Sequence, residues 1–212
     1  YILLKLINFP IRTFINPMSF SNSGNLGMTI SLFAFGSLGL ELAVIVFMIT
    51  SILHFTLGIS IWSGNWSLRF LIKTPVIYAV FLALSINFFS IELPKTLTNT
   101  TSVLAGITIP LLLFTMGISL NKISYKLDYK IIILIILRIF MALSMAYLII
   151  YLLNIDGIAK NIILLQALLP APIFTYLFAS QYNVQPDKVA NYLMTSTIIS
   201  LFTITIFLTL TL

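Results

Sequence analysis

The chain has 212 residues, of which 60% are hydrophobic and only 8% are charged, and its mean hydropathy is +1.13. Soluble domains carry about a quarter charged residues, so this composition excludes an ordinary soluble protein and indicates one that lies in the lipid bilayer. The formal charge of +6 does not indicate a nucleic-acid partner, because the basic residues stand in short gaps between apolar runs. The absence of cysteine excludes disulfides and thiolate metal sites, and we expect neither a metal nor another cofactor.

Long apolar runs separated by short polar gaps predict an all-α polytopic membrane protein, because a helical span needs about 20 largely apolar residues. The run at residues 1–9 is too short and is typical of the tail of a span, so we expect the sequence to be a fragment that lacks its N-terminal part. Residues 36–39 (Gly-Ser-Leu-Gly) predict a tight turn, since glycine tolerates positive φ. Besides the partial span, we predict seven full spans, at residues 16–36, 40–61, 74–89, 97–120, 131–153, 161–181 and 189–212.

The distribution of Lys and Arg predicts the orientation of these spans. Alternate gaps hold eight of the basic residues, whereas the opposite gaps hold only Lys95 and Lys160. By the positive-inside rule, the side with eight faces the cytoplasm, and the C-terminus lies outside the plasma membrane. The eight residues are Lys5, Arg12, Arg69, Lys73, Lys122, Lys126, Lys130 and Lys188.

Two predicted spans, 16–36 and 161–181, are interrupted near their centres. Small and polar residues at 21–27 (SNSGNLG) interrupt the first, and Pro170-Ala171-Pro172 interrupts the second. An unpaired backbone group costs several kcal/mol in hydrocarbon, so such a break is tolerated only where it lines a cavity or is buried in protein. Close helix packing through small residues is one reading. Two interrupted spans that run in opposite directions favour the other reading, the substrate site of an inverted-repeat transporter.

Four stretches of the chain resemble the auxin efflux carrier family, which also contains bacterial malate and malonate permeases. They match that family's fourth, seventh, ninth and tenth spans, and together they extend over nearly the whole chain. The stretches are FSNSGNLG at 20–27, IPLLLFTMGISL at 109–120, LPAP at 169–172 with ASQYNVQPD at 179–187, and TSTIISL at 195–201.

This resemblance implies ten spans in two inverted repeats of five, a fold similar to that of the bile acid sodium symporters. The fourth and ninth spans would cross at their breaks and hold the substrate there. On that mapping, residues 1–61 are the C-terminal part of the first repeat, 62–73 are a cytoplasmic linker, and 74–212 are the second repeat. The N-terminus of the whole protein would lie outside, which agrees with the orientation expected from Lys and Arg.

The candidate substrate-binding residues come from both breaks. The resemblance matches the family's crossover asparagine to Asn22, and its ninth-span proline to Pro170. Both breaks depart from the family pattern, because Thr29 stands where a proline is usual and Thr175 stands near a second one. Freed backbone N–H groups and asparagine amides would bind an anion. The full set is Asn22, Gly24, Asn25, Gly27, Gln166, Pro170, Pro172 and Thr175.

Two ionisable residues inside predicted spans each have two readings. Arg138 is either a counter-charge for an organic anion or a side chain that extends to the cytoplasmic interface. His54, the single histidine, either carries a proton in coupled transport, or packs between helices or reaches the cytoplasmic boundary.

These patterns predict a secondary carrier that moves a small organic anion, such as a mono- or dicarboxylate, by alternating access. H⁺ or Na⁺ as a coupling ion and a homodimer are left open. An enzyme is not expected, since the His-Glu-x-x-His and Gly-x-Ser-x-Gly motifs are absent and the acidic residues stand at span ends. The alternative is a membrane receptor or sensor on the same fold that binds its ligand without moving it.

Overall fold

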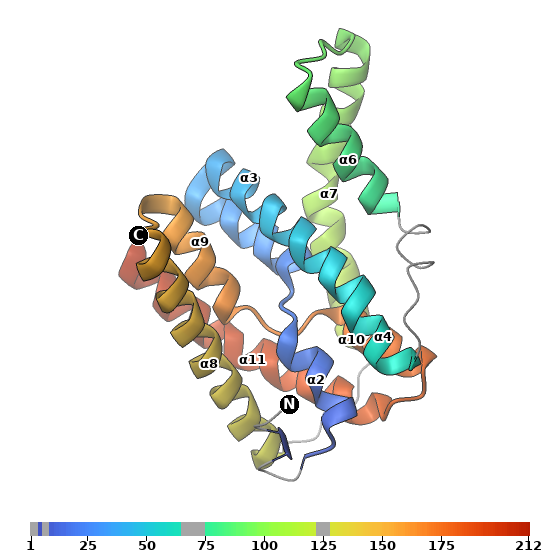
Figure 1. Ribbon diagram of the computed structural model, residues 1–212, viewed down its shortest axis with the longest axis vertical. Coiled ribbons are helices and arrows are strands. Elements are labelled where there is room, and N and C mark those ends of the chain that lie inside the picture. Colours follow the sequence, from blue (N-terminus) through green and yellow to red (C-terminus); the bar gives the residue numbers. More distant parts are fainter. Residues whose placement is uncertain (1–3, 6–8, 65–74, 122–127) are drawn as a thin grey trace.

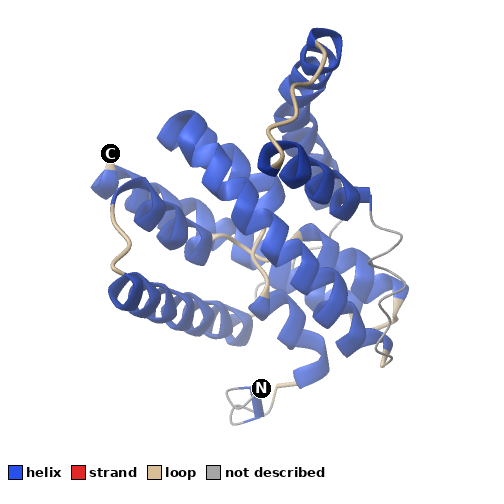
Figure 2. Ribbon diagram, turned by 45° about the horizontal axis from the view of Figure 1, so that its top comes forward, coloured by secondary structure: helices blue, strands red, loops and turns tan. Residues whose placement is uncertain are grey.

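A computed structural model describes residues 4–5, 9–64, 75–121 and 128–212. Within these ranges the chain forms α-helices and two π-helical turns, and no strand occurs among them (Figures 1 and 2). The elements are α2 (Ile11–Ser19), η1 (Ser23–Met28), α3 (Thr29–Leu53), η2 (His54–Gly58), α4 (Ile59–Ser63), α6 (Pro75–Phe88), α7 (Lys95–Asn121), α8 (Tyr129–Leu153), α9 (Gly157–Leu168), α10 (Ile173–Gln181) and α11 (Pro186–Thr211).

The predicted turn at residues 36–39 is confirmed. Helix α3 is broken at Gly36, whose φ of 68° and ψ of −157° are not helical, and the chain folds back on itself there (Figure 1). The returning arm passes close to the first one, because a Cβ on Gly39 would lie 2.5 Å from the carbonyl oxygen of Ser31. Two predicted spans, 16–36 and 40–61, therefore follow one another through a helical hairpin.

The membrane character of the chain agrees with its long apolar helices. Three helical stretches among the described residues are long and apolar enough to cross a bilayer: Ile11–Ser63, Tyr129–Leu153 and Pro186–Thr211. A fourth is obtained when α9 and α10, which are bent by 40° at a short break, count as one span. The predicted spans 74–89 and 97–120 coincide with α6 and α7. Residues 65–73 of the predicted linker lie outside the described residues, as do Arg69, Lys73, Lys122 and Lys126 of the predicted cytoplasmic side.

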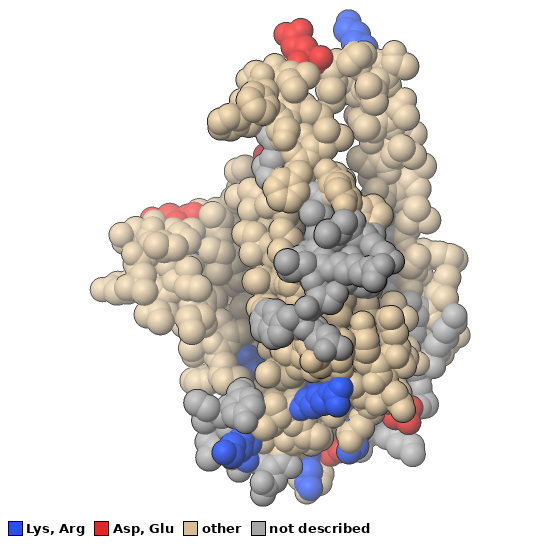
Figure 3. Space-filling model, turned by 45° about the vertical axis from the view of Figure 1, so that its right-hand side comes forward, with Lys and Arg blue, Asp and Glu red and all other residues tan. Residues whose placement is uncertain are grey.

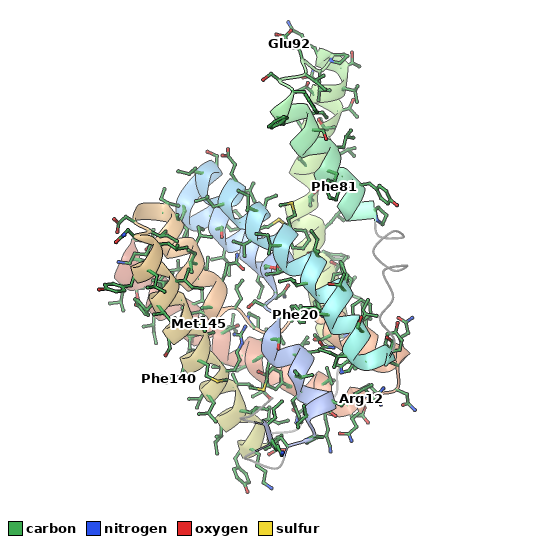
Figure 4. The ribbon with its side chains drawn as sticks, in the orientation of Figure 1. Arg12, Phe20, Phe81, Glu92, Phe140 and Met145 are labelled. Atoms are coloured by element: carbon green, nitrogen blue, oxygen red, sulfur yellow. The ribbon has the colours of Figure 1, made fainter. Side chains whose placement is uncertain are left out.

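The helices form a bundle and a projecting arm. The arm consists of α6 and α7, which lie side by side and extend beyond the other helices (Figures 1 and 2). Large apolar side chains are exposed on both parts, and Phe140 and Met145 point outward from α8 (Figure 4), with exposed fractions of 70% and 56%. An apolar outer surface of this kind suits contact with lipid.

The interior of the bundle joins helices that are distant in sequence. One apolar cluster brings α2, α8 and α11 together through Phe14, Leu134 and Tyr192. At one edge, Arg12 and Trp62 tie α2 to α4 by two reciprocal bonds: the guanidinium donates to the Trp62 carbonyl at 2.6 Å, and the indole N–H donates to the Arg12 carbonyl at 2.5 Å. These contacts hold α2 against α4, α8 and α11.

Candidate functional site

The first break separates α2 from η1. Phe20 adopts extended backbone angles, φ −112° and ψ 145°, and the π-helical turn then begins at Ser23. In this turn the N–H of Gly27 reaches back to the carbonyl of Asn22 at 3.0 Å. Ser, Asn and Gly are poor helix formers that favour caps and turns, so the sequence predicted an interruption here. The helix is interrupted slightly earlier than expected, at residues 20–22.

The second break separates α9 from α10. Leu169 and Pro172 are extended, with ψ values of 148° and 145°. Pro170 and Pro172 have no N–H, so the carbonyls of Gln166 and Leu168 lose the donors that a continuous helix would supply. The N–H of Ala171 is taken by the Ser196 hydroxyl at 3.2 Å. The prolines thus leave the C-terminal carbonyls of α9 without helical partners.

The two breaks meet. The N–H of Asn22 donates to the carbonyl of Pro170 at 2.8 Å, so a group freed by one break pairs with a group freed by the other. Thr175 is completely buried and its hydroxyl donates to the Pro172 carbonyl, which closes the start of α10. The broken spans run in opposite directions, since α2 and α9 begin at opposite ends of the bundle (Figure 1).

Arg138, on α8, bonds to both breaks. Its side chain is only 7% exposed. One terminal nitrogen donates to the carbonyls of Leu169 at 2.6 Å and Ala167 at 3.1 Å, and the other donates to the Ser21 hydroxyl at 2.7 Å. The guanidinium therefore lies at the crossing of the two broken helices.

A cavity of about 370 Å³ opens beside the first break. The polar part of the lining is neutral and comes from the break itself and from the second arm of the hairpin. The rest of the lining is apolar and largely aromatic. No Lys, Arg, Asp or Glu is among the described residues that line it. The lining comprises Phe20, Ser21, Asn22, Ser23, Gly24, Asn25, Met28, Phe47, Thr50, Ser51, His54, Phe55, Thr115, Pro172, Ile173, Phe174 and Leu177.

His54 lies among the aromatic side chains beside the cavity. Its imidazole stacks on Phe20, with ring centres 4.3 Å apart, and contacts the edge of Phe178 at 5.8 Å. His54 is 5% exposed, and its Nε2 has no hydrogen-bond partner within the described part of the chain. The imidazole lies in the π-helical turn η2, whose Gly58 carbonyl accepts a 2.8 Å bond from the Asn16 amide.

The predicted site residues fall into two groups. Asn22, Gly24, Asn25 and Pro172 line the cavity. The other four do not line it: Gly27, Gln166 and Pro170 lie where the two breaks meet, and Thr175 is buried in the first turn of α10. Arg138, the remaining predicted residue, bonds to a cavity-lining serine.

Gly27 and Gln166 face each other in that contact. A Cβ on Gly27 would lie 2.8 Å from Nε2 of Gln166 and 2.9 Å from Cδ1 of Leu169. Gln166 is 8% exposed, and neither of its amide atoms has a hydrogen-bond partner among the described residues. Thr29, which stands where the family resemblance expects proline, donates to the Asn25 carbonyl at 2.7 Å and is buried.

Several lining residues were not predicted as site residues. Phe47, Thr50, Ser51 and Phe55 join His54 on one face of the second arm of the hairpin. Their spacing, i, i+3, i+4, i+7 and i+8, is that of a single helix face. Small polar residues on one face of an otherwise apolar span were therefore the signal that could have found them. Thr115 of α7 also lines the cavity, and no local pattern indicates it.

Comparison with known proteins gives the family. A family model described as membrane transport protein matches residues 63–208, which includes the second break. An uncharacterized transporter of Methanocaldococcus jannaschii is 26% identical over 86% of this chain and 63% of its own length, so the chain spans less than two thirds of that relative. The family model matches more than half of the chain, which confirms the resemblance to the auxin efflux carrier family that the sequence showed. The chain belongs to the membrane transport protein family, that of the auxin efflux carriers.

Proposed function

We propose that the protein is a secondary carrier that moves a small organic anion through the membrane at the crossing of its two broken helices. The observation that carries this proposal is the cavity beside the first break, whose neutral polar lining is bonded to Arg138 through Ser21. A positive charge behind neutral donors attracts an anion without trapping it in a salt bridge.

The chemistry of the lining favours a monocarboxylate with an apolar body. Asn22 and Asn25 bring amides to the lining, and Phe20, Phe55 and Phe174 bring aromatic rings. A dicarboxylate would place its second charge against these rings, where a buried charge is costly. A volume of about 370 Å³ lies at the small end of ligand pockets, which span roughly 300–1,000 Å³.

The arm of α6 and α7 supplies the second body needed for alternating access. Thr115 of α7 lines the cavity, whereas the other lining residues belong to the bundle. The cavity thus lies where the bundle faces the arm, and sliding or rocking of one against the other would open it to either side of the membrane. We interpret residues 1–61 and 74–212 as parts of two inverted repeats, with the broken spans in equivalent positions.

The charge distribution supports the proposed orientation in the plasma membrane. Most of the Lys and Arg atoms visible in Figure 3 gather at the end of the bundle opposite the tip of the arm, and Glu92 lies at that tip (Figure 4). We assign the basic end to the cytoplasm by the positive-inside rule. The C-terminus, at the other end of α11 (Figure 1), would then lie outside.

Uptake into proteoliposomes tests the proposal. The full-length protein is reconstituted, and entry of radiolabelled benzoate, malate and malonate is compared with entry into empty vesicles. We expect saturable uptake, with benzoate preferred. No saturable flux of any anion would refute the carrier, and saturable binding without flux would instead establish the receptor alternative.

A further inference from the structure

We propose that Arg138 is a resident cation at the crossing, and that its guanidinium holds the carbonyl site that a coupling Na⁺ would otherwise use. Anion transport would then need no Na⁺. This inference rests on the proposed carrier function, because it concerns what drives that carrier. Arg138 acts as a positioning residue, since it bonds to the protein and does not line the cavity.

The carbonyls at the end of α9 are of the kind that bind cations in broken-helix transporters. There, unwound carbonyls and the negative C-terminal ends of half-helices coordinate Na⁺. Here the Leu169 and Ala167 carbonyls both accept from Arg138, at 2.6 and 3.1 Å. The usual helical donor for Ala167, the N–H of Ala171, is bonded to Ser196 instead. A fixed cation therefore already satisfies the oxygens that a mobile cation would need.

The positive charge of Arg138 is compensated by carbonyl dipoles and not by a carboxylate. The chain has five acidic residues, and all of them stand in turns or near helix ends. A second cation beside the guanidinium would meet a like charge with no nearby anion to offset the repulsion. The crossing is thus electrostatically closed to Na⁺ and open to an anion.

The guanidinium also fixes the two breaks relative to one another. Its second terminal nitrogen donates to the Ser21 hydroxyl at 2.7 Å, and Ser21 and the adjacent Asn22 line the cavity. The planar fork of arginine can reach both breaks at once, whereas the single ammonium of lysine keeps the charge without the fork. Loss of the charge should therefore disturb anion binding as well as stability.

Variants of Arg138 separate the charge from the volume of the side chain. Arg138→Lys keeps the charge, Arg138→Met keeps most of the volume without it, and Arg138→Ala leaves a space that a cation can enter. Arg12→Ala is the matched control, because Arg12 also donates to a backbone carbonyl, at 2.6 Å, but away from the crossing. Melting temperatures are measured on the full-length protein in NaCl, KCl and choline chloride, and benzoate and malate uptake is measured with and without a Na⁺ gradient.

For the unaltered protein we expect the same Tm in the three salts, and the same uptake with and without a Na⁺ gradient. Removing a buried hydrogen-bonded charge should lower the Tm of the Met and Ala variants by about 10 °C. Arg138→Lys should keep most of the stability that the Met and Ala variants lose. Among the variants, only Arg138→Ala should have a higher Tm in NaCl than in choline chloride, by about 3 °C or more. The Tm of Arg12→Ala should be the same in both salts.

A selective rise in the Tm or uptake of the unaltered protein with Na⁺ would overturn the inference, and this measurement does not depend on any variant folding. An Arg138→Met protein with unchanged Tm and uptake would also overturn it. If no anion is carried by the unaltered protein, the carrier proposal fails, while the Tm series still reports whether Arg138 takes the place of a cation.

Discussion

The backbone N–H of Asn22 donates a 2.8 Å hydrogen bond to the backbone carbonyl of Pro170, and this bond joins the two broken helices at their crossing. Proline cannot donate, but its carbonyl accepts freely, so the residue that breaks α9 also supplies the acceptor for the other break. Because the link uses only backbone atoms, the side chain of Asn22 can be changed without removing it.

We expect Asn22→Ala to weaken anion binding while the protein still folds. The amide lines the cavity, and losing a hydrogen bond to a charged ligand costs about 1.5–3 kcal/mol, or roughly ten- to a hundredfold in affinity. Binding is measured by isothermal titration with benzoate, and Tm by differential scanning fluorimetry. Asn99→Ala, at an exposed position of α7, is the matched control and should bind like the unaltered protein. Unchanged binding by Asn22→Ala would show that the break serves helix packing.

We expect Gly27→Ala to destabilise the crossing. The added Cβ would lie 2.8 Å from the Gln166 amide and 2.9 Å from Leu169, so the ends of these two buried side chains would have to shift. Such overpacking costs about 1–3 kcal/mol, which lowers Tm by several degrees in a thermal melt. Gly106→Ala is the control, because nothing lies within 4 Å of its added Cβ and alanine favours a helix.

A second substitution tests the cause of that loss. Gln166→Ala removes the amide that the new methyl group would strike, so it should restore part of the stability of Gly27→Ala in the double variant. If the double variant instead loses as much stability as the two single variants together, the steric contact is not the cause.

Local patterns in the sequence predicted the helices and their breaks well. The apolar runs found α8, α9 with α10, and α11, and the Gly36 turn was expected from two nearby glycines. The breaks were visible because small polar residues and prolines contradict the helical pattern around them. The two π-helical turns were not expected, since a shift from i→i−4 to i→i−5 bonding has no reliable sequence signal.

The partners at the crossing were harder to predict because they are distant in sequence. Arg138 lies 117 positions from Ser21, and nothing local shows that one guanidinium reaches both breaks. Its two readings, a counter-charge or a side chain at the interface, did not include a role in holding the crossing. The site residues on α3 depend in the same way on how the hairpin packs against the first break, although their helical spacing was a usable sign.

We expect His54→Phe to keep its stability, whereas His54→Ala should lose about 2–4 kcal/mol through the cavity that it leaves. The imidazole is 5% exposed, stacks on Phe20 at 4.3 Å, and has an Nε2 without a partner among the described residues. A phenyl ring keeps the stacking and removes the unpaired nitrogen. Chemical denaturation measures both variants.

Uptake by the His54→Phe variant decides whether the imidazole carries a proton or only packs. If it only packs among the aromatic side chains, a pH gradient across proteoliposomes should affect uptake by His54→Phe as it affects uptake by the unaltered protein. Loss of that response in a stable variant would assign a proton-carrying role to the imidazole.

Single-cysteine labelling tests the orientation directly, because the chain has no cysteine of its own. We expect Lys95→Cys and Asp156→Cys to react with a membrane-impermeant maleimide in intact cells, and Lys130→Cys and Lys188→Cys to react only after permeabilisation. All four positions are exposed, and Ala146→Cys, at a buried position of α8, is the unreactive control. The reverse pattern would invert the orientation derived from the basic residues. Labelling of positions 130 and 156 from the same side would show that α8, which lies between them, does not cross the membrane.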